Sequence, residues 1–203
     1  GLPMFNACVT EALQLQESIN GLVFENEQVS AVNVSGIEFE EVVFHKCRFD
    51  RCRFDGCTFH QAKWLGCDFS NCSFQKSYWK KCEIKASKAD GASFCESCFK
   101  ESRMTESSLS YANFAQCTLE ECAFDACRLH EAFLSEVKLK KTTFEQTDLT
   151  RSDFFKTSLK GVDLSTCTLD GLMVSDGFSE LKGARVRMDQ AVQFAVRLGL
   201  EIV

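Results

Sequence analysis

The sequence predicts an all-β solenoid, a chain wound into stacked coils, with a short helix near its C-terminus. The prediction rests on a five-residue repeat that runs without a break from Ile19 to Val174. Every fifth residue over this segment gives 32 positions, of which 31 carry a large apolar side chain and one is Ala89. A period of five fits neither the period of a helix, about 3.6, nor that of an extended strand, about 2. The chain must therefore turn a corner every five residues.

A second column of small residues lies two positions before each large one. From Cys47 to Cys167 this small column holds only Cys, Ala, Ser, Thr and Val. We expect both columns to point inward, because backbones stacked about 4.8 Å apart leave little room beside an aromatic ring. The other three positions of each repeat are mostly polar or charged and should face water.

Ten of the 13 cysteines fall in the small column: Cys47, Cys52, Cys57, Cys67, Cys72, Cys82, Cys117, Cys122, Cys127 and Cys167. Buried free Cys behaves as a small hydrophobic residue, which suits such a column. A spacing of five sends neighbouring thiols to different corners, so we expect no metal site. Cys8, Cys95 and Cys98 lie outside the column, and the last two are expected to be exposed. The odd count and the lack of a signal segment favour reduced thiols and a cytoplasmic protein.

Composition limits the function. The 203 residues carry a net charge of −6, and the length suits one domain. This balance opposes general binding to nucleic acid or anionic membranes, and no apolar run approaches the roughly 18 residues of a membrane span. No Gly-rich phosphate loop, nucleophile elbow or zinc-protease motif is present. The histidines, His45, His60 and His130, fall on outward positions of three different faces. We therefore expect neither an enzyme nor a cofactor.

The net charge is concentrated at the N-terminal end. Residues 1–45 contain seven Glu and no Lys or Arg, a charge of −7, whereas the other 158 residues sum to +1. Further along, on the face centred on Phe39 and Phe59, the charge alternates between coils. Lys138, Lys140 and Lys141 should stack beside Glu120 and Glu121 as surface ion pairs. An acidic end is predicted but no continuous acidic stripe, and an ordinary solvated face is the alternative.

Both ends should be capped, because a solenoid otherwise exposes apolar faces and unpaired edges. We assign residues 1–16 to an N-terminal cap, 17–176 to the repeat and 177–203 to a C-terminal segment. Ser175–Lys182 should be a loop, Met188–Leu198 a helix ending at Gly199, and Leu200–Val203 a short strand. The apolar surface exceeds what a small cap needs, so a two-fold dimer contact is favoured over a simple cap. Its residues would be Phe178, Leu181, Met188, Ala191, Val192, Phe194, Ala195, Leu198, Leu200 and Ile202.

The repeat resembles the pentapeptide-repeat family, whose consensus is close to A-(D/N)-L-x-x with Phe often replacing Leu. The best matches are residues 67–71 (CDFSN), 112–116 (ANFAQ) and 162–166 (VDLST). The resemblance implies a right-handed quadrilateral β-helix with four repeats per coil. At 20 residues per coil, the 160 residues from 17 to 176 would make about eight coils.

The C-terminal segment resembles the Qnr and MfpA branch of that family. The residues that carry the resemblance are 169–172 (LDGL), 181–183 (LKG), 189–191 (DQA) and 197–203 (RLGLEIV). In that branch this segment forms a homodimer, and an acidic rod mimics DNA to protect DNA gyrase and topoisomerase IV from quinolones. Many members carry two loops, whereas this chain has no insertion between Ile19 and Val174 and resembles the loop-free members.

Binding to gyrase or topoisomerase IV is therefore the favoured function, with antibiotic resistance as its consequence. The binding residues would be acidic side chains of the first coils: Glu25, Glu27, Glu38, Glu40 and Glu41. Two alternatives stay open at this point. The protein could be a structural or scaffold rod with no topoisomerase contact, or an immunity protein against another gyrase poison.

Overall fold

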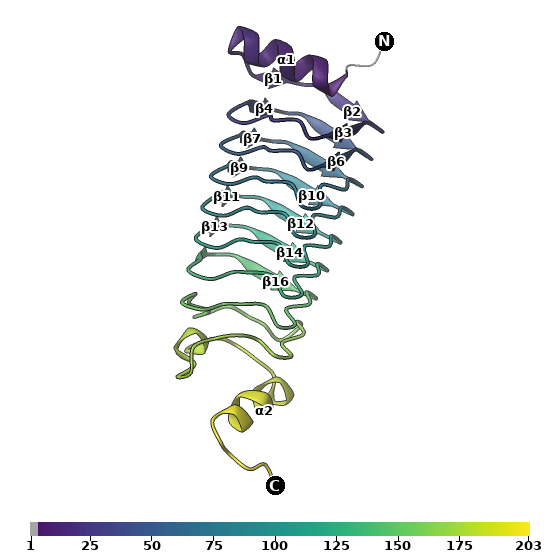
Figure 1. The fold of residues 1–203 in the computed structure, drawn as a ribbon. Helices are drawn as coiled ribbons and strands as arrows, with labels where there is room; N and C mark the ends of the chain where they lie inside the picture. Colours follow the sequence, from purple (N-terminus) through teal and green to yellow (C-terminus); the bar gives the residue numbers. More distant parts are fainter. Residues whose placement is uncertain (1–3) are drawn as a thin grey trace.

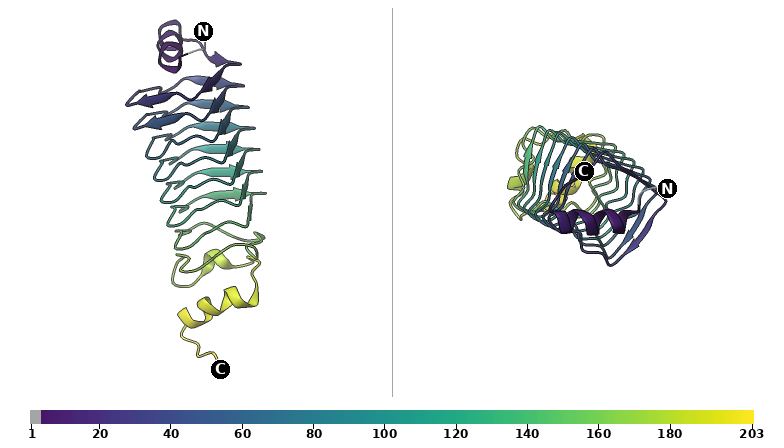
Figure 2. Two further views of the ribbon diagram at one scale, coloured as in Figure 1. Left: turned by 90° about the vertical axis from the view of Figure 1, so that its right-hand side faces the viewer. Right: turned by 90° about the horizontal axis from the view of Figure 1, so that it is seen from above.

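Residues 4–203 are described in the computed structural model, in which the chain winds into a right-handed β-helix with four-sided coils (Figure 1, Figure 2). Successive coils are offset by 20 residues. Phe39 pairs in register with Phe59, and Phe99 with Leu119. Residues 1–3 of the predicted N-terminal cap lie outside the described residues. The repeat thus sets both the shape of a coil and the alignment of each coil on the next.

Parallel strands stack into two long sheets and one short sheet. The first face holds β1 (Ile19–Asn20), β4 (Glu38–Glu40), β7 (Thr58–His60), β9 (Tyr78–Lys80), β11 (Cys98–Lys100), β13 (Thr118–Glu120) and β15 (Lys138–Lys140). The second holds β2 (Val23–Glu25), β5 (Val43–His45), β8 (Lys63–Leu65), β10 (Glu83–Lys85), β12 (Arg103–Thr105), β14 (Ala123–Asp125) and β16 (Thr143–Glu145). The third holds β3 (Gln28–Ser30) and β6 (Arg48–Asp50), and the fourth is joined by isolated parallel bridges such as Asn113↔Phe133.

The predicted count of eight coils is too high for the regular solenoid. The seven strands of each long sheet enclose about six turns. Beyond β16 the chain continues to coil, but only isolated bridges such as Asp153↔Met173 join the coils. The spacing then lengthens, because Asp163 pairs with Arg185, which is 22 residues later. The final coil is thus two residues longer than the coils before it, and it begins after the last strand, β16, has already ended.

Both inward columns form the core, as predicted. Of the 32 large positions, 30 are buried, and Leu139 and Val174 are partly buried. Aromatic rings stack along the axis, with ring centroids 4.8 Å apart for Phe54 and Phe74, and 5.1 Å apart for Phe74 and Phe94. Such ring pairs stabilise a fold by about 0.5–1.5 kcal/mol beyond the burial of their area.

The small column does more than fill space. The Sγ of Cys117 lies 2.9 Å from the carbonyl oxygen of Phe94 in the preceding coil, to which the thiol donates. Ser97 Oγ donates in the same way to the carbonyl of Phe74 at 2.9 Å. Burial raises the pKa of the Cys117 thiol to about 12, so it stays protonated at neutral pH. The interpretation as a small hydrophobic residue is therefore incomplete, because each buried thiol or hydroxyl also needs an acceptor.

The corners of the coils use left-handed backbone. Glu41, Lys46 and Arg51, each at a corner, have φ of 53°, 52° and 52°. A left-handed conformation costs a residue with a Cβ roughly 1–2 kcal/mol. Hydrogen bonds between coils offset the cost, for example from Glu41 N–H to the His60 carbonyl at 2.9 Å. These corners hold the charged side chains on the outside of the rod.

A helix lies at each end. The N-terminal cap contains α1 (Phe5–Leu15), and the C-terminal segment contains α2 (Met188–Arg197), close to the predicted helix at Met188–Leu198. The predicted loop contains a turn of 3₁₀ helix, η1 (Ser179–Leu181). The short strand predicted at Leu200–Val203 is wrong, because these residues have no assigned secondary structure. They extend past the last coil, where no neighbouring strand is present among the described residues.

Candidate partner-binding surfaces at the two ends

The N-terminal cap closes the core with an aromatic side chain. Phe5 is fully buried, and its ring lies 5.1 Å from the ring of Phe49 and 5.3 Å from that of Phe24. Val9 and Ala12, on the same side of α1, are also buried. The helix therefore turns its apolar side to the solenoid and leaves its polar side to solvent, which is the usual arrangement.

One of the predicted partner-binding residues holds this cap in place. Glu27 Oε1 accepts a hydrogen bond from the N–H of Phe5 at 2.8 Å, at the N-terminus of α1. A carboxylate is favourable there because the first N–H groups of a helix have no partner within it. The other oxygen of Glu27 is buried and has no hydrogen-bond partner. The prediction of Glu27 as a free partner-binding residue is therefore wrong, because its carboxylate is turned into the protein.

The other four predicted Glu residues lie on the surface of the first coils. Glu25 and Glu40 reach histidines of the next coil: Glu25 Oε1 lies 3.4 Å from His45 Nδ1, and Glu40 Oε1 lies 2.7 Å from His60 Nδ1. Glu38 and Glu41 are exposed. Within residues 4–203, none of the seven N-terminal Glu side chains has a Lys or Arg within 4.0 Å. The structure thus leaves the negative charge of this end without a basic partner.

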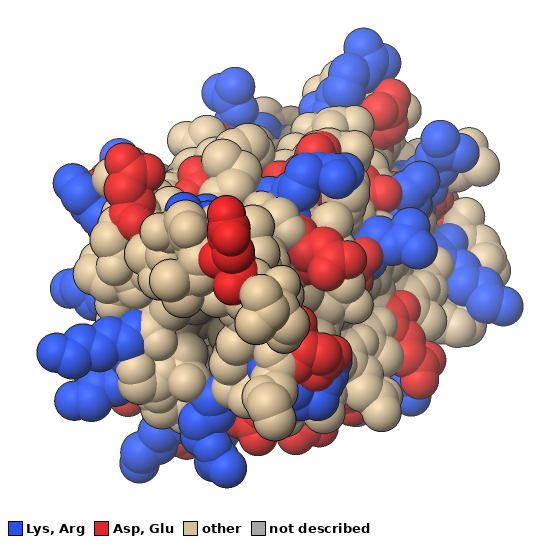
Figure 3. Space-filling model, turned by 90° about the horizontal axis from the view of Figure 1, so that it is seen from below, with Lys and Arg blue, Asp and Glu red and all other residues tan. Residues whose placement is uncertain are grey.

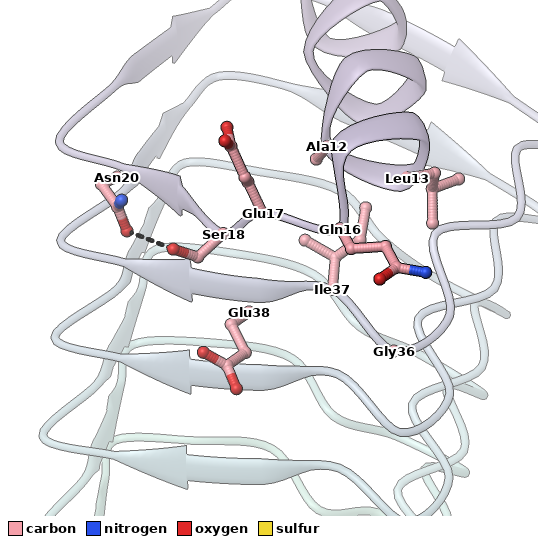
Figure 4. Close-up of a pocket in the computed structure, with 9 residues that line it drawn as sticks. All are labelled: Ala12, Leu13, Gln16, Glu17, Ser18, Asn20, Gly36, Ile37 and Glu38. Carbon is pink, nitrogen blue, oxygen red and sulfur yellow. Dashed lines mark hydrogen bonds between the residues drawn. The ribbon is translucent and has the colours of Figure 1, made fainter.

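A hollow lies beside α1 at the same end (Figure 4). It has a volume of about 770 Å³ and is open to solvent. Its lining comes from the last turn of α1, the start of the first coil and the corner at Gly36: Ala12, Leu13, Gln16, Glu17, Ser18, Asn20, Gly36, Ile37 and Glu38. The side chains of Glu17 and Glu38 point away from each other. The two carboxylates therefore do not converge on one point, as a general acid and base would.

The middle of the rod is close to neutral, and its ion pairs differ from those predicted. On the first face Lys81 lies 4.0 Å from Glu101, and Lys100 lies 3.9 Å from Glu120. The predicted partners of Glu120 and Glu121, namely Lys138, Lys140 and Lys141, have no carboxylate within that range among the described residues. Stacking one coil apart brings these lysines near the Glu pair, but Lys100 on the other side takes the carboxylate of Glu120. The third histidine, His130, lies 3.9 Å from Glu131.

At the C-terminal end, α2 turns its polar side to the solenoid. The Nε2 of Gln190 donates to the carbonyls of Leu164 and Cys167 at 2.9 and 2.8 Å. Gln193 Nε2 donates to the Leu169 carbonyl at 2.9 Å, and an Arg197 amino group to the Leu172 carbonyl at 2.7 Å. These carbonyls belong to the last coil, where no further coil supplies N–H groups. The helix takes the place of that missing coil.

A buried carboxylate satisfies amide groups at the same end. Glu180 is 4% exposed, and its side chain accepts hydrogen bonds from Lys156 N–H at 2.9 Å and from the Ser175 hydroxyl at 2.7 Å. Burial alone would raise the pKa of Glu180, but these hydrogen bonds outweigh it and the pKa is lowered. The side chain is therefore ionised and bonded at neutral pH.

The apolar side of α2 consequently faces solvent. Met188 is 89% exposed, and Val192, Val196, Leu198, Leu200 and Ile202 are exposed as well. Ala191 and Ala195 are partly exposed beside them. Seen from below, this end shows a largely uncharged centre crossed by a few acidic side chains, with Lys and Arg around the rim (Figure 3). Sequence reasoning missed Val196, which lies on the same exposed side of the helix.

Phe194 does not belong to this surface, and its prediction as a dimer residue is wrong. It is 9% exposed, and its ring lies 5.7 Å from that of Phe178. The guanidinium of Arg197 lies over both rings, 5.0 Å from the centroid of Phe178 and 5.6 Å from that of Phe194. Phe178 and Leu181 are themselves partly buried against the core. Phe178, Leu181 and Phe194 therefore dock the C-terminal segment on its own chain.

The cysteines lie as the two columns require. All ten small-column thiols are buried, and the 13 cysteines are free. Cys8, Cys95 and Cys98 are half-buried, so the predicted full exposure of Cys95 and Cys98 is wrong. Among residues 4–203 no group of three or more His, Cys, Asp or Glu is placed to hold a metal ion. No described helix has the length and apolar character of a membrane span.

Comparisons with known proteins concern the repeat. A family model described as a pentapeptide repeat region matches residues 18–94 and 97–174. The chain has no match among curated protein sequences. Among solved structures, a trypsin-treated form of QnrB1, a plasmid-mediated fluoroquinolone resistance protein, is 22% identical, covers 92% of this chain and 100% of its own, and has a TM-score of 0.41.

Two further solved structures come from photosynthetic organisms. HetL of the cyanobacterium Nostoc, a pentapeptide repeat protein involved in heterocyst differentiation regulation, is 10% identical over 90% of this chain and 95% of its own, with a TM-score of 0.25. A pentapeptide repeat protein of the Arabidopsis thaliana thylakoid lumen is 17% identical over 62% of this chain and 66% of its own, with a TM-score of 0.35.

Proposed function

The chain belongs to the pentapeptide-repeat family, and we propose that it is a non-enzymatic protein that binds DNA gyrase or topoisomerase IV and protects it from quinolone-type inhibitors. The acidic N-terminal end would enter the positively charged groove in which the enzyme holds DNA. The rod would then act as a DNA mimic, with the contact made at its end.

One observation carries this proposal. The seven Glu of residues 1–45 have no Lys or Arg within 4.0 Å, whereas in the rest of the described chain seven Lys or Arg side chains each lie within 4.0 Å of a carboxylate. Glu25, Glu38, Glu40 and Glu41 lie on two adjacent faces of the first two coils. A concentrated charge of one sign speeds association with a surface of the other sign and makes binding sensitive to salt. The C-terminal resemblance to the Qnr and MfpA branch agrees with a topoisomerase as the partner.

The C-terminal end supports a homodimer as the working form. The outward side of α2 and the residues after it expose Met188, Val192, Leu198, Leu200 and Ile202. An apolar surface of this kind on one end of a rod suits an isologous two-fold contact, in which the same patch of both copies meets. Such a dimer would leave the two acidic ends at opposite tips, each free to bind the enzyme.

The direct test is gyrase supercoiling in the presence of a quinolone, with this protein titrated at low and moderate salt. The key variant is Glu40→Gln with Glu41→Gln. The matched control is Glu120→Gln with Glu121→Gln, which occupies the equivalent two positions of the same face four coils further on. We expect rescue by the native protein that weakens with salt. The Glu40/Glu41 variant should need about ten times the concentration of the native protein for the same rescue. The control variant should need less than about twice the concentration of the native protein.

Other outcomes would change the conclusion. An equal loss of rescue in both double variants would mean that the total charge of the protein matters and that its location at the N-terminal end does not. Rescue that is insensitive to salt would keep the function and remove the electrostatic mechanism. If supercoiling is neither rescued nor inhibited, the scaffold function replaces the topoisomerase contact. Rescue from a different gyrase poison alone would identify an immunity protein.

A further inference from the structure

An exposed aromatic row crosses the fourth face of the rod, away from both ends. Tyr111, Phe133 and Phe155 are 53%, 46% and 44% exposed, and Met173 beside them is 51% exposed. Within the described coils, the only other exposed large apolar side chain between Ile19 and Val174 is Val23. The row therefore stands out because other large outward side chains, such as Val43, Leu65 and Tyr78, are partly buried, and it lies outside both proposed contacts.

The register of the coils places these side chains next to one another. Phe133 pairs with Asn113 on one side and Asp153 on the other, and Asp153 pairs with Met173. Tyr111, Phe133 and Phe155 follow each other at intervals of 22 residues, so each lies one coil further and two residues along. Tyr111 lies at the corner that precedes the fourth face (φ 60°), and from Tyr111 to Met173 the side chains cross three coil spacings, about 14 Å at about 4.8 Å per coil.

No part of the described chain covers the row. Tyr111 contacts His130 edge to face at 5.9 Å, and Lys156 Nζ lies 5.3 Å from the centroid of Phe155. Among the described residues neither Phe133 nor Phe155 packs against another ring. The neighbouring outward positions hold Ala115 and Ser135, which are too short to reach over the rings. Four apolar side chains thus remain in solvent, which is costly unless a partner binds them.

We propose that this row binds an amphipathic helix of another protein, with Lys or Arg beside its apolar side. A partner strand cannot add to this face, because its backbone is already bonded from coil to coil, for example from Leu134 N–H to the Asp153 carbonyl at 2.7 Å. A helix can pack on such a layer. The length of about 14 Å is close to three helical turns of about 5.4 Å each, so apolar residues at i, i+4, i+7 and i+11 would meet the row.

The charge around the row determines which side chains of the partner helix are favourable beside its apolar stripe. On the fourth face and in the corner column below Tyr111, the charged side chains are Glu131, Glu136, Arg151, Asp153, Lys156 and Asp176, a net charge of −2, with Glu131 and Arg151 paired to each other. Basic side chains beside the apolar stripe of the partner would therefore be attracted, and acidic ones repelled. This contact does not depend on the proposed binding of a topoisomerase at the N-terminal end.

The test uses a fluorescent 14-residue probe peptide built from Leu and Lys, with Leu at positions 1, 5, 8 and 12, and a scrambled peptide of the same composition. Binding is followed by fluorescence polarisation with the native chain, with Phe133→Ser plus Phe155→Ser, and with Val23→Ser. Val23 is the matched control because it is 46% exposed on another face. Thermal unfolding of each variant confirms that the rod is intact.

We expect the native chain to bind the amphipathic peptide at least tenfold more tightly than the scrambled one. The double variant should lose that preference, and Val23→Ser should stay within twofold of the native chain. Equal binding of both peptides, or no effect of the double variant, would overturn the proposal. If the double variant instead abolishes self-association in sedimentation velocity, the occupant is a second copy of this chain and the proposed partner is wrong.

Discussion

The two ends of the rod are capped by helices that face in opposite ways. At the N-terminal end, α1 buries Phe5, Val9 and Ala12 and leaves polar residues outside together with Leu13 and Leu15. At the C-terminal end, α2 buries Gln190 and leaves Met188 and Val192 outside. The first arrangement ends a hydrophobic core, whereas the second satisfies a row of backbone carbonyls. A cap that docks through polar groups therefore keeps an apolar side available for a partner.

The interior differs between the ends as well, which explains the two kinds of cap. The first coils are filled with Phe, and the top of that column needs another ring to complete it. The last coils are filled with Leu, such as Leu164, Leu169 and Leu172, and their carbonyls lack the N–H groups of a following coil. An unsatisfied buried carbonyl costs about 1–3 kcal/mol, and the carbonyls of Cys167 and Leu172 accept hydrogen bonds from side chains of α2, so these bonds favour the observed orientation of the helix.

The largest effect should come from removing the aromatic side chain of the N-terminal cap. Phe5→Ala leaves a cavity above the rings of Phe24 and Phe49 and should lower the free energy of unfolding by about 3–5 kcal/mol. Urea denaturation measures it. The control is Leu15→Ala in the same helix, where the side chain is 54% exposed and a loss below about 1 kcal/mol is expected. A similar loss of free energy of unfolding in Phe5→Ala and Leu15→Ala would show that α1 stabilises the fold through helix formation and not through Phe5.

The next effect tests the polar docking of the other end. Gln190→Ala removes both hydrogen bonds to the Leu164 and Cys167 carbonyls, and we expect a loss of about 2 kcal/mol. Hydrogen exchange should show faster exchange in α2 and unchanged protection in the coils before β16. Replacing Gln193, which makes one such bond and is less buried, should cost less. A negligible loss at Gln190 would mean that Phe194 and Phe178 alone hold the helix.

A smaller effect should depend on pH. The pKa of Glu180 is lowered in the folded state, so its ionised form stabilises the fold at neutral pH, and this contribution is lost as the pH falls below the ordinary value of 4.5 through the folded one. Glu180→Gln should lower stability by about 1–2 kcal/mol at pH 7. The difference from the native chain should shrink as the pH approaches 3. Urea midpoints at pH 7, 5 and 3 provide the comparison, and a difference that does not change with pH would contradict an ionised Glu180.

The smallest effect concerns the small column. Cys117→Ser should change the free energy of unfolding by less than about 1 kcal/mol, because Ser97 and Ser102 already occupy equivalent positions and a hydroxyl can donate to the Phe94 carbonyl as the thiol does. Cys117→Ala, which removes both the donor and the volume of the sulfur atom, should cost more than the Ser variant. A greater loss for Ser than for Ala would mean that the column selects apolar character and that its hydrogen bonds are unimportant.

The repeat made the architecture predictable, because a period of five leaves only one way to bury Phe44, Phe49 and Phe54 together. The helix at the C-terminus was predictable from its own apolar spacing. Its orientation was not, because the rule that an apolar side faces inward takes no account of carbonyls such as those of Cys167 and Leu172, whose hydrogen bonds come from side chains of α2. The role of Glu27 depends on a contact with Phe5 from 22 residues earlier, and no local pattern signals it. The two extra residues of the last coil become visible only when Asp163 is found opposite Arg185, 22 residues later.

The central claim is that the C-terminal end joins two copies and the acidic ends point away from each other. Small-angle X-ray scattering of the native chain and of Val192→Asp with Val196→Asp tests it directly. We expect a native dimer whose longest dimension is about twice that of the variant, because the two rods meet end to end. The variant should be monomeric, because both substituted side chains lie on the exposed side of α2. A native monomer, or a dimer no longer than the variant, would contradict an end-to-end dimer.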